Sequence, residues 1–219
     1  MSELWLVRHG QSISNAGLPT GLPGDSGLTD VGRLQAMRTA EALPRAPDLI
    51  LVSAYARAVD TARPAMERFP LAPVETAPVH EFTYLSPGKY AGTTRAMRHP
   101  LIRDFWRRCD PLYRDGEGAE TFAELAARVE AFFARYVDSR DGKGGLTVVY
   151  SHGQFIRAVL LRFFGGLTAD PDPLAMARFR GFREAFPVHN ASILRMTAGP
   201  DRRVGPFEVS HLPPELRTL

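Results

Sequence analysis

The sequence predicts an α/β fold of three layers, α/β/α, with a mostly parallel central sheet. Short apolar runs that are typical of buried strands alternate with segments of helical periodicity, and this alternation favours a parallel sheet covered by helices on both faces. The five clearest runs are residues 4–7, 49–52, those around Val74, 146–150 and 193–196, and a weaker sixth run lies near 207–209. A long irregular stretch in the middle of the chain is the third observation, and it predicts a cap.

The first helix is expected between the first two strands. Thr29 is a suitable N-cap, and Val31, Leu34 and Met37 recur at near-helical spacing before Pro44 ends the segment.

A second helix is expected to begin after Thr121, because Glu124 three residues later completes a capping box. Apolar side chains then recur on one helical face and are predicted to pack in the core: Phe122, Leu125, Val129, Phe132, Phe133 and Tyr136. A third helix is expected over residues 155–164 and ends at Gly165 and Gly166.

The segment from Pro78 to Gly118 is predicted to be an irregular cap insertion. It contains four prolines and four glycines, with aromatic residues between them. Long insertions inside a compact domain are commonly functional. Ligands of parallel α/β sheets bind beyond the carboxyl ends of the strands, so this segment is placed to cover them.

Length and composition favour one globular domain over residues 1–219, with 44% hydrophobic residues available for a core. A single cysteine, Cys109, excludes an intrachain disulfide framework and fits a reducing compartment. Only four apolar residues follow Glu3, which is too few for a signal peptide or a spanning helix. We therefore expect a cytoplasmic protein without a membrane partner. The net charge of +3 is too small to predict a nucleic-acid partner.

Two predicted strands end in the same way, with a histidine and a glycine. The first strand leads into Arg8, His9 and Gly10, and the fourth leads into Ser151-His152-Gly153. If these strands are adjacent, both imidazoles lie side by side in one crevice. Glycine after each histidine lets a ligand approach the backbone closely, and helices that follow would point N–H groups at an anion.

A third strand ends near Ser53 and passes into a helix that carries Arg57 in its first turns. Arginine guanidinium groups match tetrahedral oxyanions, so Arg8 and Arg57 are predicted to hold a phosphoryl group. Their charge disfavours protonation of His9, and a neutral histidine can attack phosphorus. His152 is placed to donate to the phosphoryl oxygens. Taken alone, each histidine is typical of a structural residue, and Arg57 of a surface residue; the joint pattern predicts a phosphate pocket with a nucleophile.

The chain also resembles the histidine phosphatase superfamily, which includes the cofactor-dependent phosphoglycerate mutases. Seven blocks occur in the family's order across nearly the whole chain: LVRHGQSISN in the 4–15 region, GLTDVGRLQA (27–36), SAYARAVDTA (53–62), the glutamate of VHEFTY (79–84), GAETFAELAARV (118–129), VVYSHGQFIR (148–157) and HNAS (189–192).

The resemblance implies a role for each matching residue. His9 is then the phosphorylated nucleophile and His152 the second pocket histidine, with Arg8, Arg57 and Asn15 around the phosphate. Glu81 takes the place of the acid that protonates the leaving oxygen and then activates water, which requires one group to act both ways. Ser14 and Gln154 are further candidates for contact with substrate or phosphate.

A metal enzyme is the main alternative, since two histidines and a glutamate can bind zinc. The residues HEFTY have a tyrosine where the zinc helix motif needs its second histidine. The sequence has no cysteine pair and no glycine-rich phosphate loop with its lysine. We expect no metal and no cofactor.

The expected function is a phosphomonoesterase that acts through a phosphohistidine on a small phosphorylated metabolite. Phosphoglycerate mutase-type transfer and a phosphoprotein phosphatase or binding domain stay open as alternatives. The segment after Glu81 lacks the tyrosine-glycine and leucine-asparagine-lysine pattern of phosphoglycerate mutases, which favours hydrolysis. The stretch DFWRRCDP (104–111) is similar to their tryptophan-arginine-arginine stretch, so Arg107 and Arg108 are candidates for binding a second anionic group.

Overall fold

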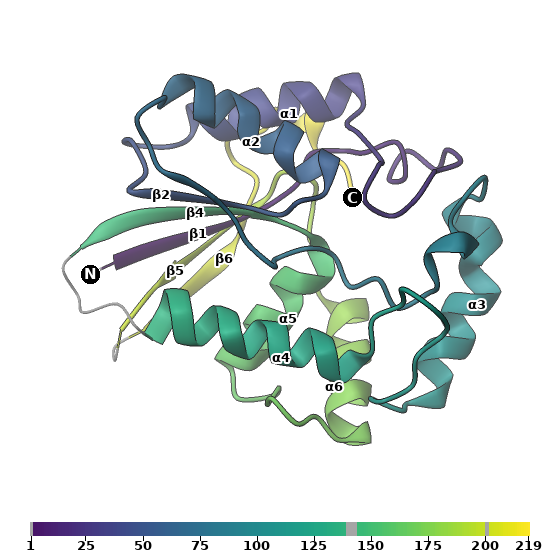
Figure 1. The fold of residues 1–219 in the computed structure, drawn as a ribbon. Helices are drawn as coiled ribbons and strands as arrows, with labels where there is room; N and C mark the ends of the chain where they lie inside the picture. Colours follow the sequence, from purple (N-terminus) through teal and green to yellow (C-terminus); the bar gives the residue numbers. More distant parts are fainter. Residues whose placement is uncertain (1, 139–143, 200–201) are drawn as a thin grey trace.

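The central sheet runs through the middle of the molecule, with helices on both faces (Figure 1). The structure is a computed structural model that describes residues 2–138, 144–199 and 202–219. Within these residues six strands form one sheet in the order β3-β2-β4-β1-β5-β6. Their bounds are β1 Ser2–Arg8, β2 Leu49–Val52, β3 Val74–Thr76, β4 Gly145–Ser151, β5 Ile193–Thr197 and β6 Val204–Glu208.

The sheet is mixed, with a parallel part and an antiparallel edge. Strands β3, β2, β4 and β1 run parallel to one another, while β5 runs antiparallel to β1 and β6 antiparallel to β5. The register of β1 against β4 places Arg8 opposite Ser151. The residues that follow these two strands therefore meet at the carboxyl edge of the sheet, where α/β folds bind ligands.

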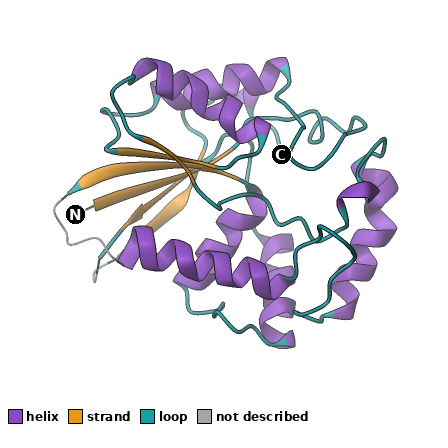
Figure 2. Cartoon of the chain, in the orientation of Figure 1, coloured by secondary structure: helices purple, strands orange, loops and turns teal. Residues whose placement is uncertain are grey.

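Two layers of helices bury the two faces of the sheet. Helices α1 (Asp30–Glu41) and α2 (Ala56–Arg68) lie on one face, and α4 (Phe122–Phe132), α5 (Gly153–Phe163) and α6 (Pro173–Ala185) lie on the other (Figures 1 and 2). Successive strand residues point to opposite faces. On β1, Leu4 and Leu6 accordingly belong to the core beneath α4 and α5, whereas Trp5 and Val7 belong to the core beneath α1 and α2. The predicted three-layer architecture is confirmed.

Helix α1 begins where the sequence predicts, but with a different buried face. Thr29 caps it by accepting a hydrogen bond from the N–H of Gly32. Leu34 and Met37 are each 45% exposed, and the buried residues are Gly32, Gln35, Ala36, Thr39 and Ala40. The helix lies so close to the loop after β1 that a Cβ at Gly32 would be 2.1 Å from the carbonyl oxygen of Gln11. Small and polar residues thus face inward because there is no room for larger ones.

The capping box at the start of α4 is present as predicted, with Thr121 and Glu124 each bonded to the other's backbone N–H. The six apolar residues predicted for the core are all buried. Helix α4 continues as a π-helical turn over Phe133–Asp138. Helix α5 ends before Gly165 and Gly166, as expected.

The cap over residues 78–118 is less irregular than predicted. It contains the 14-residue helix α3 (Arg95–Arg108), which Thr94 caps through the N–H of Met97 and which includes Pro100. Its buried residues are Arg98, Phe105 and Trp106, so its buried face is only partly apolar. Pro100 and the many charged residues concealed this helix. Helix α6 was also not predicted from the sequence, although Asp172 caps its N-terminus. No helix of the described residues is long and apolar enough to cross a membrane.

Candidate active site

Two histidines lie together at the carboxyl edge of the sheet. His9 follows β1 and His152 follows β4, and the N–H of His9 donates to the carbonyl of Ser151 at 2.9 Å. The centroids of the two rings are 5.1 Å apart, and both side chains are buried. The expected juxtaposition follows from the parallel pairing of the two strands.

Hydrogen bonds determine which nitrogen of His9 is free to react. Its Nδ1 lies 2.7 Å from the carbonyl oxygen of Gly10. A carbonyl only accepts, so Nδ1 carries the proton and Nε2 keeps its lone pair. Nε2 accepts a hydrogen bond from Nε of Arg57 at 3.1 Å. Burial lowers the pKa of His9 well below its ordinary value, with Arg57 and Arg8 adding to the effect. The ring is therefore neutral; burial, more than the arginine charge invoked from the sequence, keeps it so.

Ser53 orients the second histidine. Its hydroxyl lies 2.8 Å from Nε2 of His152, while Nδ1 of His152 is buried without a hydrogen-bond partner. Burial is again the first cause of a lowered pKa for His152, followed by the charge of Arg57. His152 is packed beside His9 but does not line the cavity described below, so it is not in position to donate to a phosphoryl group there as expected. The sequence marked Ser53 only as a strand end and missed this contact.

Arg8 and Arg57 bring positive charge to the histidine pair from two different elements. Arg57 stands in the first turn of α2 and also donates to the carbonyl of Pro23 at 2.7 Å. Arg8 donates to the carbonyl of Val188, and its Nε is buried without a partner. Both guanidinium groups are thus bonded to neutral acceptors.

Glycine is required after His9 by a close approach of the backbone, since a Cβ at Gly10 would lie 2.5 Å from the carbonyl oxygen of Gly32. The expectation that a helix follows each histidine is only half right. His152 is the N-cap of α5, whereas a long loop separates His9 from α1.

The amide of Asn15 is held in one orientation. Its Oδ1 accepts from the backbone N–H and the hydroxyl of Ser12, at 3.2 and 3.0 Å, and from Nδ2 of Asn190 at 3.1 Å. The oxygen is occupied, so the amide presents its N–H groups to a ligand. Asn190 also donates to the carbonyl of His9 at 3.3 Å. The sequence block HNAS contained this positioning residue without revealing its contact.

Glu81 lies on the loop between β3 and α3. Its Oε1 accepts from the backbone N–H of Phe82 at 3.0 Å and of Gln154 at 3.1 Å. The side chain is half-buried and lines the cavity. Backbone N–H groups thus fix the orientation of the Glu81 carboxylate through Oε1, in the cavity that His9 also lines.

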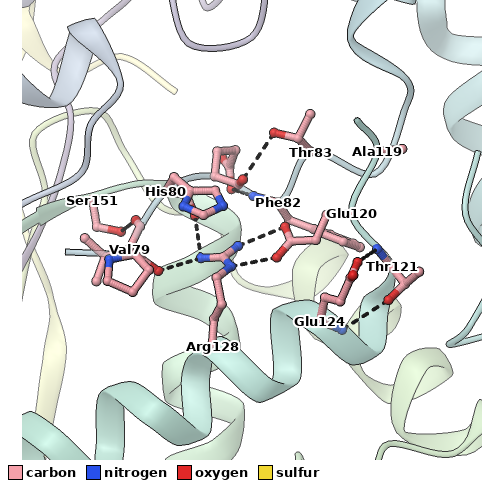
Figure 3. Close-up of polar contacts among 12 residues, drawn as sticks. Val79, His80, Phe82, Thr83, Ala119, Glu120, Thr121, Glu124, Arg128 and Ser151 are labelled. Atoms are coloured by element: carbon pink, nitrogen blue, oxygen red, sulfur yellow. Dashed lines mark hydrogen bonds and ion pairs between the residues drawn. The ribbon is translucent and has the colours of Figure 1, made fainter. Parts of the chain in front are cut away.

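Arg128 of α4 holds the segment that carries Glu81 (Figure 3). It donates to the carbonyls of Pro78 and His80 at 2.9 and 3.1 Å. It also forms a two-point ion pair with Glu120, at 2.6 and 2.9 Å. The N–H of Glu120 donates in turn to the carbonyl of Thr83 at 2.8 Å. Sequence reasoning missed this clamp, because its partners are backbone carbonyls about fifty residues away.

A cavity of about 450 Å³ opens in front of His9. It brings together most of the residues predicted from the sequence: Arg8, His9, Ser14, Asn15, Arg57, Glu81 and Gln154. Aromatic and apolar side chains, Tyr55 and Tyr84 among them, complete the wall. A cleft of this size fits a small metabolite.

Arg107 and Arg108 do not line this cavity. Arg107 pairs with Asp104 at 3.1 Å on the surface of α3, and Arg108 lies over the ring of Tyr113. Helix α3 turns another face to the cavity, formed by Arg95, Arg98 and Ile102, which share a side because they are three and four residues apart. The structure thus leaves the expected arginine pair outside the site.

Comparison with known proteins agrees with this geometry. The family description "Histidine phosphatase superfamily (branch 1)" matches residues 4–203. The chain belongs to the histidine phosphatase superfamily.

Several members of the superfamily are similar over most of this chain. Glucosyl-3-phosphoglycerate phosphatase of Mycobacterium tuberculosis is 34% identical over 167 residues, which cover 72% of this chain and 73% of that protein. A solved structure of mycobacterial glucosyl-3-phosphoglycerate phosphatase in complex with VO3 has a TM-score of 0.68 at 27% identity, covering 96% of this chain and 100% of that one. Alpha-ribazole phosphatase from Shigella flexneri shares the fold, with a TM-score of 0.71 at 21% identity over 94% of this chain and 96% of that one.

A metal site is the alternative that the sequence left open for this member of the superfamily. Among the described residues, no group of three or more His, Cys, Asp or Glu side chains is arranged to hold a metal ion. The side chains that line the cavity beside His9 include the guanidinium groups of Arg8 and Arg57 and the amide of Asn15, whose N–H groups bind anions.

Proposed function

We propose that the protein hydrolyses phosphomonoesters of small metabolites through a phosphohistidine formed on Nε2 of His9. One observation carries the proposal: a neutral histidine with its lone pair on Nε2 faces a cavity lined by Arg8 and Arg57. Phosphatase relatives within the same superfamily support hydrolysis as the outcome.

In the first step, Arg8, Arg57 and the amide of Asn15 bind the phosphoryl oxygens and stabilise their charge. Nε2 of His9, released from its hydrogen bond with Nε of Arg57, attacks phosphorus while the bond from phosphorus to the ester oxygen breaks. Glu81 enters this step as an acid and gives its proton to the leaving oxygen. The alcohol product then departs.

In the second step, Glu81 accepts a proton from water, and the oxygen attacks the phosphohistidine. The phosphorus–nitrogen bond breaks, inorganic phosphate forms, and His9 and Glu81 return to their first state. His152, oriented by Ser53, packs beside the ring of His9. The cytoplasmic location, the single domain over residues 1–219 and the absence of a cofactor remain predictions.

The test is turnover of p-nitrophenyl phosphate by the purified protein, with and without EDTA. We expect activity that survives EDTA and falls by at least about a thousandfold in His9→Ala, as for removal of a nucleophile. His99→Ala is the matched control, because that histidine is exposed on α3 and does not line the cavity. Full activity in His9→Ala, or loss with EDTA, overturns the mechanism.

Two further measurements separate the alternatives. An acid-labile phosphorus–nitrogen signal in ³¹P NMR of rapidly quenched enzyme is expected for the wild type and not for His9→Ala. Exchange of phosphate between the 2- and 3-positions of phosphoglycerate without net release would instead identify a mutase. Binding of phosphopeptides without turnover of any phosphomonoester would identify a binding domain.

A further inference from the structure

The cavity holds more positive charge than one phosphoryl group needs. Six arginine side chains and two acidic side chains, Glu81 and Glu184, line it among the residues that the structure describes. Arg8 and Arg57 are assigned above to the phosphoryl group. The other four arginines are Arg95, Arg98, Arg157 and Arg183. Arg98 is engaged by Thr93, to which it donates twice at 2.7 Å, and it lies over the ring of Tyr90.

Arg157 of α5 lies beside Arg8. A Cβ at Gly153 would be 3.1 Å from Nη1 of Arg157 and 3.5 Å from Nε of Arg8, so both guanidinium groups border the same point. Nε of Arg157 donates to the carbonyl of Phe186 at 2.7 Å, and Nη1 donates to the carbonyl of Gly153 at 3.1 Å. These bonds orient the group without neutralising it. In the described part of the chain, no carboxylate lies within ion-pair distance of Arg157.

Arg183 of α6 extends this positive wall. It lies over the ring of Trp106, 4.6 Å from the centroid, and its Nε is buried without a hydrogen-bond partner. Its nearest carboxylate, on Glu184, is 3.8 Å away and 61% exposed, which makes a weak pair. An unpartnered buried donor on a cavity wall is poised for a ligand oxygen.

Arg95 completes the group from α3, on the exposed side of the cavity. Burial is the main cause that lowers the pKa of Arg157. The charge of Glu81 opposes this shift, and the charges of Arg183 and Arg95 add to it. Burial lowers the pKa of Arg8 to about 10, and Arg157 and Arg95 contribute. The cationic groups therefore repel one another, and an anion bound between them would relieve that repulsion.

We propose that Arg157, Arg183 and Arg95 form a second anion subsite, and that the substrate is a compact phosphomonoester with another anionic group close to the ester. The inference rests on the proposed function for the position of the phosphoryl group. Because Arg8 and Arg157 border the same point, the second anionic group lies within a few bonds of the phosphorus. A carboxylate and a second phosphate share this chemistry, and the test distinguishes them.

The test compares ligands that differ only in the second group. 3-Phosphoglycerate and glycerol 3-phosphate differ by a carboxylate in place of a hydroxymethyl group, and 1,3-propanediol bisphosphate and monophosphate differ by a second phosphate. For each pair, two ratios between its members are measured. The first is the ratio of their kcat/KM values in the wild type, and the second is the ratio of their Kd values, measured by calorimetry in His9→Ala, which binds without turnover. We expect at least tenfold preference for the member of one pair that carries the second anionic group, since charged hydrogen bonds are strong. The pair with the larger ratio identifies the group.

Charge-removing variants locate the preference. Arg157→Gln and Arg183→Gln are each expected to reduce the ratio at least tenfold. Arg95→Gln, at an exposed position that cannot disturb folding, is expected to reduce it about threefold. Arg107→Gln is the matched control on the outer face of α3 and leaves the ratio unchanged.

The outcomes separate this inference from the proposed function. Selective binding by His9→Ala without turnover of any ester by the wild type overturns the function and supports the subsite. Turnover of all esters with ratios near one overturns the subsite and leaves the function standing. An unchanged ratio in Arg157→Gln and Arg183→Gln also overturns it, because the preference then arises elsewhere.

Discussion

Arg128→Met is expected to destabilise the protein and to displace Glu81. The Arg128–Glu120 pair is largely buried, with side chains 14% and 12% exposed. Removing one partner of a buried pair costs about 3–5 kcal/mol, because the other charge is left without compensation. The carbonyls of Pro78 and His80 lose their donor at the same time. The expected loss is therefore a large part of the 5–15 kcal/mol typical of a domain.

The loss should depend on pH in a definite direction. Burial raises the pKa of Glu120 even though the bonds to Arg128 oppose the shift. Without Arg128 the pKa rises further, so the folded variant favours the protonated acid. The destabilisation, measured as the difference in free energy of unfolding between Arg128→Met and the wild type at the same pH, should then grow as pH rises from 5 to 8. The double variant Arg128→Met/Glu120→Gln should show no such growth and should recover part of the stability.

Urea unfolding followed by tryptophan fluorescence measures these changes, since Trp5 and Trp106 are both buried. Arg38→Met is the matched control. Its pair with Glu41 has side chains 50% and 61% exposed, so the expected loss is at most about 0.5 kcal/mol. A loss below 1 kcal/mol in Arg128→Met would show that the contacts of Arg128 with Glu120, Pro78 and His80 contribute little to the free energy of unfolding.

Kinetics test the positioning role separately. A displaced Glu81 should slow an alkyl phosphate, which needs a proton on its leaving oxygen, at least tenfold more than p-nitrophenyl phosphate, whose leaving group departs without one. Equal slowing of both substrates would mean that Arg128 acts on stability alone.

The remaining predictions concern packing, orientation and pH. Gly32→Ala should cost at least about 2 kcal/mol in urea unfolding, because its Cβ would overlap the carbonyl of Gln11; Gly181→Ala, with open space around it, should cost nothing. Ser53→Ala should lower kcat about tenfold by freeing the ring of His152. The pKa values of His9 and His152 are lowered, and that of His80 is lowered to about 4. Below pH 6.5 these histidines therefore bind protons in the unfolded chain but not in the folded chain. The free energy of unfolding should therefore fall with decreasing pH, by about 1.4 kcal/mol per unit for each such histidine.

Each of these has an outcome that contradicts it. Equal stability of the two glycine variants would mean that the loop moves aside freely. Unchanged kcat in Ser53→Ala would mean that packing alone holds His152. A free energy of unfolding that does not change between pH 7 and 5.5 would show that these histidines are protonated in the folded state. The same pH slope in His80→Gln as in the wild type would show this for His80.

Local patterns were sufficient for much of the fold. The apolar runs predict all six strands, and the capping box at Thr121 predicts the start of α4, because strand period and cap chemistry depend on residues a few positions apart. The pairing of His9 with His152 was also predictable, since a parallel sheet brings the carboxyl ends of its strands to one edge. Helix α3 was not, because Pro100 lies inside it and its buried face includes an arginine beside two aromatic residues.

Contacts between elements decided the rest. The inward face of α1 depends on how closely the loop after His9 approaches Gly32, which no spacing within the helix records. Arg128 stabilises the Glu81 segment through carbonyls of a distant loop, and Arg95, Arg157 and Arg183 converge from α3, α5 and α6. The pair Arg107 and Arg108, chosen from a local motif, points elsewhere. Periodicity describes which side of an element is apolar, but distances between elements are set by packing of the whole chain, and the charge around a ligand depends on those distances.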